Sequence, residues 1–281
     1  MKTKNLFYIL GVSAIISLGV ISCQKEDAKS PEVIAAEDDA IADELYDNVF
    51  TEVEEATASM EDAIYGGNRK SAAVETCRTI TVDIPGDTIT WPKTITVDYG
   101  DGCAGLNSRI RTGKIIIVVS NRITSPYYSR TITFENFYID GFKVEGTKTI
   151  AKAGETDNGN PLFTITLTNG KITSPEGKTV TRQFTHTREW VTGYSTPRIR
   201  LDDEYMITGT ASGTDRNEVA YTRLIVLPLH VKHLCPWIVS GSIKITKTDK
   251  PEVTLDYGND VCDRIATITI GDKTSTIQLH R

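Results

Sequence analysis

The spacing of apolar residues changes once along this chain, close to residue 67. Between residues 34 and 67 apolar side chains recur every three or four positions with Asp and Glu between them, which is the pattern of one face of an α-helix. Gly66 and Gly67 end this pattern, and Thr51 and Ser59 mark candidate breaks. The short, irregular repeat disfavours a partner-binding coiled coil. We therefore expect an acidic amphipathic helix over residues 34–67 that covers one face of a sheet.

After the helical segment the apolar pattern has a period of two. β-branched apolar residues alternate with Thr, and turn dipeptides such as Asn169-Gly170 separate the segments. The clearest segments are Thr79–Val82, Lys93–Val97, Thr131–Phe134 and Ile265–Ile270. Roughly a dozen short strands with few helical intervals indicate antiparallel pairing. We expect a mainly β protein, an antiparallel β sandwich or barrel-like assembly with one N-terminal amphipathic helix.

Two of the predicted strands are apolar on both faces. They run from Ile115 to Val119 and from Leu224 to Leu227. A strand that is apolar on both faces is typical of the middle of a sheet that is covered on both sides. We expect both strands to be central, with the acidic helix on one side.

The first 22 residues have the parts of an export signal. Lys2 and Lys4 give a positive start, Leu6–Val20 is an apolar run, and the small residue Ser22 stands just before Cys23. The run of 15 residues is shorter than the ~18–20 that span a bilayer, which disfavours an uncut membrane anchor. We expect residues 1–22 to be a signal peptide.

Two short motifs at this point carry a resemblance. Val20–Cys23 resembles the lipobox of bacterial lipoproteins, in which the cysteine becomes the first mature residue and carries acyl chains such as palmitate. Gln24–Asp27 resembles the tag that directs lipoproteins of the Bacteroidota to the outer face of the outer membrane. The resemblance implies lipidation of Cys23, a lipidated tether over residues 23–33 and exposure at the cell surface. Stable anchoring takes two or more acyl chains.

Four cysteines remain when Cys23 is set aside. An even number in an exported chain favours disulfides over metal or redox chemistry. The spacing from Cys77 to Cys103 nearly equals that from Cys235 to Cys262, which favours these two local pairs among the three connectivities. A four-cysteine zinc site is the rival, but no C-x-x-C spacing is present.

The two cysteine pairs belong to similar segments at the two ends of the β region. Thr96–Cys103 and Thr254–Cys262 both contain Asp-Tyr-Gly, and each is followed by Arg-Ile and a predicted strand. We expect related disulfide-closed units at 77–119 and 235–281 within one β domain over 68–281. These copies, together with Lys143–Thr149, Thr187–Trp190 and Cys235–Gly241, resemble a group of exported proteins and lipoproteins of the Bacteroidota to which no activity is assigned. The resemblance implies an envelope address and β-rich architecture.

The net charge of −6 is unevenly distributed. The segment from Gln24 to Ile64 has 14 acidic residues against two lysines, whereas the segment from Tyr65 to Arg281 has 27 basic residues against 23 acidic ones. A basic patch of the kind that binds nucleic acid is not indicated. We expect contact with the membrane through the lipid anchor, and no nucleic-acid partner.

One predicted strand carries a candidate ligand-binding face. Because alternate residues of a strand share a face, aromatic and basic side chains form a ladder between residues 180 and 190. The ladder consists of Arg182, Phe184, His186, Arg188 and Trp190. Aromatic rings stack on sugars and guanidinium groups bind carboxylates, so this face could hold a glycan. The alternative, which we favour, is that the aromatic rings pack in the core while the Arg stems cross neighbouring strands.

The two Asp-Tyr-Gly segments are weak candidates for calcium sites. Calcium prefers clusters of oxygen ligands, and four aspartates lie in these segments: Asp98, Asp101, Asp256 and Asp260. Asp and Gly also dominate ordinary turns, which is the interpretation that we favour. We expect no other metal site.

Catalytic motifs do not appear in the sequence. The chain has neither a G-x-S-x-G nucleophile motif nor an H-E-x-x-H zinc helix. We expect no enzymatic activity and no cofactor. The leading hypothesis is a surface-tethered outer-membrane lipoprotein that acts as a binding or adhesion module for a glycan or a host-matrix protein. The alternative is a structural envelope protein that scaffolds an accessory subunit through its acidic helix.

Overall fold

The computed structural model describes residues 31–65, 77–83, 89–104, 109–196, 199 and 201–279. One helix, α1 (Pro31–Tyr65), precedes the strands. These strands are β1 (Thr79–Asp83), β2 (Lys93–Asp98), β3 (Cys103–Ala104), β4 (Ile110–Val119), β5 (Ser129–Ile139), β6 (Phe142–Glu155), β7 (Pro161–Thr173), β8 (Thr179–Thr192), β9 (Glu204–Thr214), β10 (Ala220–Lys232), β11 (Ser240–Thr246), β12 (Val253–Asn259), β13 (Ile265–Ile270) and β14 (Lys273–Gln278).

The predicted helix is present with slightly different bounds. It begins three residues before the predicted start at residue 34 and continues through Thr51 and Ser59, so the predicted breaks are wrong. Gly66 and Gly67 lie outside the described residues, as do the predicted signal peptide, Cys23 and residues 24–30 of the tether. Within the described residues, no helix combines the length and apolarity that a membrane span requires.

The described strands form one antiparallel sheet. Each strand pairs with its neighbours in sequence from β1 to β14, except that β2 pairs directly with β4, and the short β3 pairs with β4 alone. The mainly β, antiparallel architecture is confirmed. The sheet is a single open layer, however, and not a sandwich or a closed barrel, because β1 and β14 remain separate edges.

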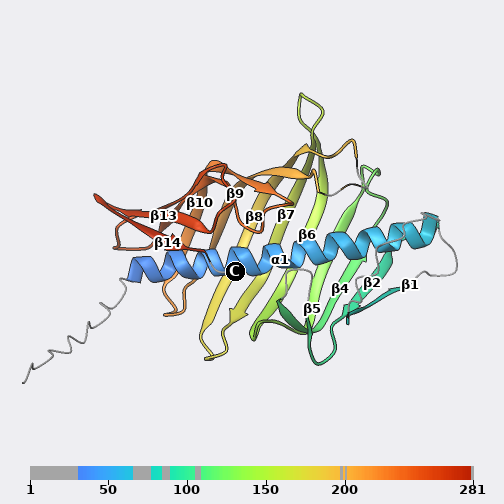
Figure 1. The fold of residues 1–281 in the computed structure, drawn as a ribbon, viewed down its shortest axis with the longest axis horizontal. Helices are drawn as coiled ribbons and strands as arrows, with labels where there is room; N and C mark the ends of the chain where they lie inside the picture. The colour runs from blue at the N-terminus through green and yellow to red at the C-terminus, as the bar shows by residue number, and fades with distance from the viewer. Residues whose placement is uncertain are drawn as a thin grey trace, which may run out of the picture.

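Helix α1 is the second layer and lies across the strands rather than along one of them (Figure 1). It contacts β2 near one edge of the sheet and β12 and β13 near the other. Its 35 residues give a length of about 52 Å. The ten inter-strand steps from β2 to β13 span about 48 Å, so one helix is long enough to cover nearly the whole width of the sheet.

The core lies between α1 and the face of the sheet that it covers. Val49, Val53 and Ala56 of the helix have no exposed surface, and they pack with inward-facing residues such as Ile117 and Leu167. The expectation that the helix covers a face of the sheet is therefore confirmed. The buried apolar residues of α1 therefore belong to the same core as the strand residues that they contact.

The opposite face of the sheet has no covering layer among the described residues. Val118 of β4 and Leu224 and Leu227 of β10 are exposed, although Ile117 and Ile225 beside them are buried. The two doubly apolar strands are central, as predicted, but the expectation that both of their faces are covered is wrong. Only the inward side faces the helix; the outward apolar side chains lie on an otherwise polar surface.

The covered face is basic as well as apolar. Buried cationic residues point inward from six strands: Lys93, Arg111, Arg130, Lys148, Arg182, Arg188 and Arg223. A buried cation is costly unless a carboxylate pairs with it. The acidic residues of α1 supply such carboxylates, which a second apolar sheet would not do. This charge match explains why a helix rich in Asp and Glu forms the second layer.

Candidate functional site

The predicted ladder of β8 lies on the face that α1 covers. Every second side chain of this strand is buried, from 2% exposed at Arg182 to 8% at Phe184 and Trp190, and the buried set is Arg182, Phe184, His186, Arg188 and Trp190. Phe184 stacks on His186 with ring centroids 4.2 Å apart. The Trp190 indole donates a hydrogen bond of 3.1 Å to Asp203. The residues share a face as predicted, but the structure supports the packing interpretation over a displayed ligand-binding ladder.

Two arginines and two aspartates form a buried cluster at the start of α1. Arg182 of β8 donates to Asp39 at 2.6 Å and to Asp43 at 2.5 Å. Arg223 of β10 lies 2.6 Å from Asp43 and 3.0 Å from the second oxygen of Asp39. Each guanidinium therefore bridges both carboxylates. Burial disfavours the charged guanidinium, but the two carboxylates outweigh it and raise the pKa of Arg182.

His186 sits beside this cluster as a neutral imidazole. Burial, together with the surrounding charges of Arg223, Arg182, Lys148 and Arg188, lowers the pKa of His186 to about 2. A histidine with so low a pKa stays unprotonated near neutral pH. It acts as a packed ring and not as an acid or a base.

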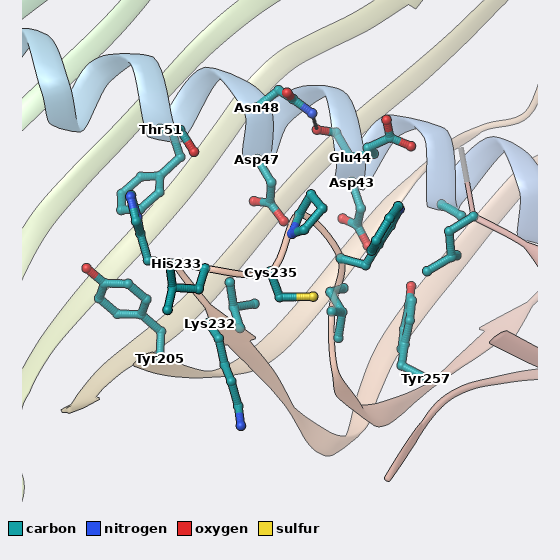
Figure 2. A pocket seen from close by; sticks show the side chains of 18 of the residues that line it. Asp43, Glu44, Asp47, Asn48, Thr51, Tyr205, Lys232, His233, Cys235 and Tyr257 are labelled. Carbon is teal, nitrogen blue, oxygen red and sulfur yellow. Dashed lines mark hydrogen bonds between the residues drawn. The ribbon is translucent and has the colours of Figure 1, made fainter. Parts of the chain in front are cut away.

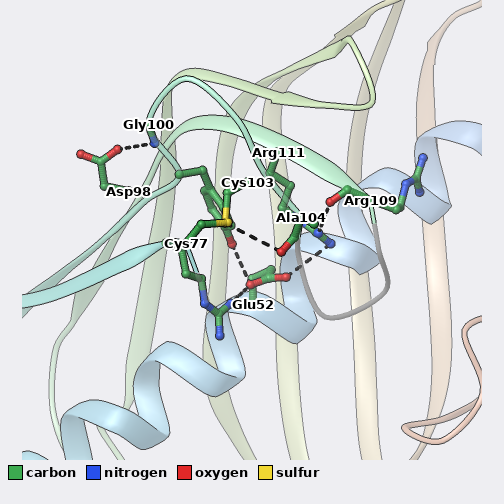
Figure 3. The surroundings of a disulfide bond; sticks show 10 residues. Glu52, Cys77, Asp98, Gly100, Cys103, Ala104, Arg109 and Arg111 are labelled. Carbon is green, nitrogen blue, oxygen red and sulfur yellow. Dashed lines mark hydrogen bonds and ion pairs between the residues drawn. A yellow bond between two sulfur atoms is a disulfide. The ribbon is translucent and has the colours of Figure 1, made fainter. Parts of the chain in front are cut away.

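A second cluster lies farther along the helix, next to a disulfide (Figure 3). Glu52, which is 1% exposed, pairs with Arg78 and lies 3.3 Å from Arg111. The Tyr99 hydroxyl donates to the same carboxylate at 2.7 Å, and burial raises the pKa of Tyr99 to about 12, so the phenol keeps its proton. Cys77 immediately precedes Arg78, so the disulfide helps to fix the arginine against α1.

Both predicted disulfides are confirmed. Cys77 bonds to Cys103 and Cys235 bonds to Cys262, with Cα atoms 5.5 and 5.7 Å apart. In each pair the first cysteine precedes a strand and the second follows the partner of that strand in a hairpin. The two ends of the sheet thus carry related closures, as the internal similarity predicts.

The two Asp-Tyr-Gly segments contain the four calcium candidates, Asp98, Asp101, Asp256 and Asp260, and they share one local hydrogen bond. The Asp98 carboxylate accepts the Gly100 amide at 2.9 Å, and the Asp256 carboxylate accepts the Gly258 amide at 2.7 Å. Asp260 pairs with Lys232 at 2.6 Å. Within the described ranges, no group of three or more His, Cys, Asp or Glu side chains is arranged to hold a metal ion. The geometry supports the ordinary turn interpretation.

A cavity of about 310 Å³ lies between α1 and the segment that joins β10 to β11 (Figure 2). Asp43 and Asp47 point from the helix toward the segment that carries His233 and Cys235. Arg188 and Tyr205, from β8 and β9, line the same space. Arg188 is the only residue of the predicted ladder that does so. The volume is at the lower end of the range for small-molecule sites.

A wider hollow of about 710 Å³ lies on the open face of the sheet, across β7 to β11. Its outward-facing residues are mostly hydroxyl-bearing: Thr166, Thr168, Gln183, Thr185, Thr210, Ser212, Thr222, Leu224, Lys244 and Thr246. The strand register places Thr166, Thr185, Thr210, Leu224 and Lys244 in one row across the sheet. Gln183, Ser212, Thr222 and Thr246 form the next row. Neighbours in a row are about 4.8 Å apart.

Comparisons with known proteins assign no function to the cavity or to the hollow. No protein-family model matches the chain, and no curated protein or solved structure matches it either.

The sequence pattern predicted neither the cavity beneath α1 nor the hollow on the open face. Asp47 lay within the predicted acidic helix and Arg188 within the ladder, but nothing in the pattern brings them to one cavity. The outward Thr residues of β8 had a signal, because they alternate with the ladder. The same alternation places Thr on the open face of β7 and β9 as well.

Proposed function

We propose that this chain is a non-enzymatic binding module of the outer-membrane surface, tethered by acyl chains on Cys23, and that it binds a glycan on the open face of its sheet. The observation that supports the proposal is the hydroxyl-rich hollow across β7 to β11. It lies on the face that α1 leaves uncovered, so a large extended ligand can reach it without any movement of the helix.

The chemistry of the hollow suits a polyhydroxyl ligand. The hydroxyl groups of Thr166, Thr185, Thr210 and Thr222 make no side-chain hydrogen bond to another described residue. Each can donate one hydrogen bond and accept two. The rows repeat at the strand spacing of about 4.8 Å, which offers regularly placed partners to a chain of sugar rings. Leu224 adds an apolar contact for a ring face.

Binding of glycans to hydroxyl-deleted variants tests this proposal. Mucin O-glycans, chondroitin sulfate and arabinoxylan serve as probes in calorimetric titrations. Because a neutral hydrogen bond contributes about 0.5–1.5 kcal/mol, we expect Thr185→Val and Thr210→Val each to weaken binding about 2- to 10-fold. Thr276→Val, an exposed threonine of β14 outside the hollow, is the matched control and should bind normally. Absence of binding by all three probes, or equal binding by all variants, would contradict the proposal.

The cellular location is tested separately. Protease added to intact cells should cleave the unaltered protein, and cleavage should disappear when Lys25, Glu26 and Asp27 are changed to alanine. Full protection of the unaltered protein would place it inside the envelope. In that case a glycan of the external medium would no longer be its ligand.

The alternative of a scaffold that holds an accessory subunit through the acidic helix has less support. The apolar stripe of α1 is packed against the sheet, and carboxylates such as Asp39 and Glu52 pair with sheet arginines. The helix therefore has few groups left for a partner on that side.

A further inference from the structure

The charged residues around the cavity beneath α1 are paired with two exceptions. Asp43 pairs with Arg182 and Arg223, Glu44 with Arg109, Glu52 with Arg78 and Arg111, and Lys232 with Asp260. Arg188 and Asp47 remain. Within the described ranges, neither has an ion pair or a side-chain hydrogen bond to another residue.

Arg188 is buried in a way that orients its guanidinium. It is 5% exposed, and its Nε is buried without a hydrogen-bond partner. The central carbon of the guanidinium lies 3.8 Å from the centroid of the Phe50 ring and 5.0 Å from that of Tyr205. Aromatic rings hold the flat group in place but satisfy none of its N–H donors. An arginine held in this way keeps its planar edge free for a carboxylate.

Asp47 gives the cavity a charge of the opposite sign. It projects from α1 into the cavity (Figure 2), where burial raises the pKa of its carboxyl group and the charges of Lys148 and Arg188 oppose that effect. The Tyr257 hydroxyl, also buried without a hydrogen-bond partner, lines the same space. Buried polar groups are normally satisfied, so a set of unsatisfied ones around a cavity indicates a missing partner.

The remaining wall of the cavity is apolar. Phe50, Tyr205, Val231, Trp237 and Ile238 contribute to it. A ligand of matching chemistry carries an anionic group, a cationic group and an apolar side chain, and it fits within a volume of about 310 Å³. A free amino acid with an aromatic or branched apolar side chain has these three parts.

We propose that this cavity is a binding site for a small zwitterion of the α-amino-acid type. Its carboxylate accepts hydrogen bonds from Arg188, its ammonium group donates to Asp47, and its apolar side chain packs against the aromatic wall. The site is on the opposite face of the sheet from the hydroxyl-rich hollow, so glycan binding and amino-acid binding can fail independently.

Calorimetric titration of the full chain with three related molecules tests the assignment. L-Phenylalanine carries both charges, 3-phenylpropanoate lacks the ammonium group, and phenethylamine lacks the carboxylate. Hydrogen bonds to charged groups are strong, so we expect each truncated molecule to bind roughly 10- to 100-fold more weakly than L-phenylalanine. L-Leucine and L-glutamate test whether the side-chain pocket is apolar, and L-glutamate should bind least.

Variants of the two unpaired residues assign the contacts. In Arg188→Gln, L-phenylalanine should bind no better than phenethylamine; in Asp47→Asn, it should bind no better than 3-phenylpropanoate. Arg122→Gln, which replaces an exposed arginine in the segment that joins β4 to β5 and does not line the cavity, is the matched control and should behave as the unaltered chain. Circular dichroism verifies folding, and if Arg188→Gln does not fold, Asp47→Asn alone decides. Failure of all amino acids to bind at millimolar concentration, or affinity unchanged by the folded variants, would overturn the proposal.

Discussion

Replacement of Asp39 by leucine should destabilise the fold far more than the loss of a surface ion pair. The Asp39 carboxylate is fully buried and lies 2.6 Å from Arg182 and 3.0 Å from Arg223. Without it, two buried guanidinium groups share the single carboxylate of Asp43. Removal of one partner of a buried ion pair costs about 3–5 kcal/mol, whereas exposed pairs contribute about 0.2–1 kcal/mol.

Urea denaturation followed by circular dichroism measures this loss without adding salt that screens charges. The double variant Asp39→Leu/Arg182→Met leaves Asp43 and Arg223 as a balanced pair at 2.6 Å. We therefore expect it to recover about 2 kcal/mol relative to Asp39→Leu alone. Asp157→Ala, in an exposed turn, is the control and should change stability by less than about 0.5 kcal/mol. A loss below about 1 kcal/mol for Asp39→Leu, or strictly additive effects in the double variant, would refute a buried ionic interface.

Three further predictions follow from the same interface. The unfolded pKa of histidine is about 6.5 and the folded pKa of His186 is about 2, so the unfolded chain binds the extra proton and stability falls as pH decreases below 6.5. In urea titrations between pH 6.5 and 4.5, His186→Phe should therefore lose about 2.3 kcal/mol less than the unaltered protein. Parallel curves for the two proteins would contradict this. The double variant Cys77→Ser/Cys103→Ser should lose about 3.5 kcal/mol on the chain-entropy model for a separation of 26 residues, and a loss near zero in urea would show that the loop is constrained by other contacts. Deletion of residues 30–64 should abolish cooperative thermal unfolding of the β region, because it exposes the buried cations and the core; an intact transition would show that the sheet folds without α1.

Local patterns were enough to predict the helix, the antiparallel strands and the cover that the helix gives to one face of the sheet. They did not predict that the strands form one open sheet with the other face uncovered, or the chemistry between helix and sheet. The helical period of residues 34–67 and the alternation after Thr79 specify which residues share a face. Alternation does not specify which face is buried, so the row from Arg182 to Trp190 was also consistent with a displayed ladder, although core packing was the favoured interpretation. Arginine on a strand usually indicates solvent. Its burial here depends on carboxylates such as Asp39 that are far away in sequence.

The cavity and the open hollow depend on long-range register in the same way. The cavity brings together Asp47, Arg188 and the segment 231–238. These residues are far apart in sequence, so no local periodicity predicts that they meet. The disulfides were predictable because each pair closes a local unit, and the near-equal spacing of Cys77–Cys103 and Cys235–Cys262 selected the pairing.

The central claim is that α1 is an integral layer of the fold, held to the sheet by its apolar stripe and by buried ion pairs. Native-state hydrogen exchange of the intact chain, read by mass spectrometry at peptide resolution, tests it most directly. We predict that amides of residues 42–60 exchange only through the same opening reaction as those of β4 and β8, with equal free energies and equal dependence on urea. Fast exchange in α1 while β4 and β8 stay protected would show that the helix is a detachable element, and would contradict the account.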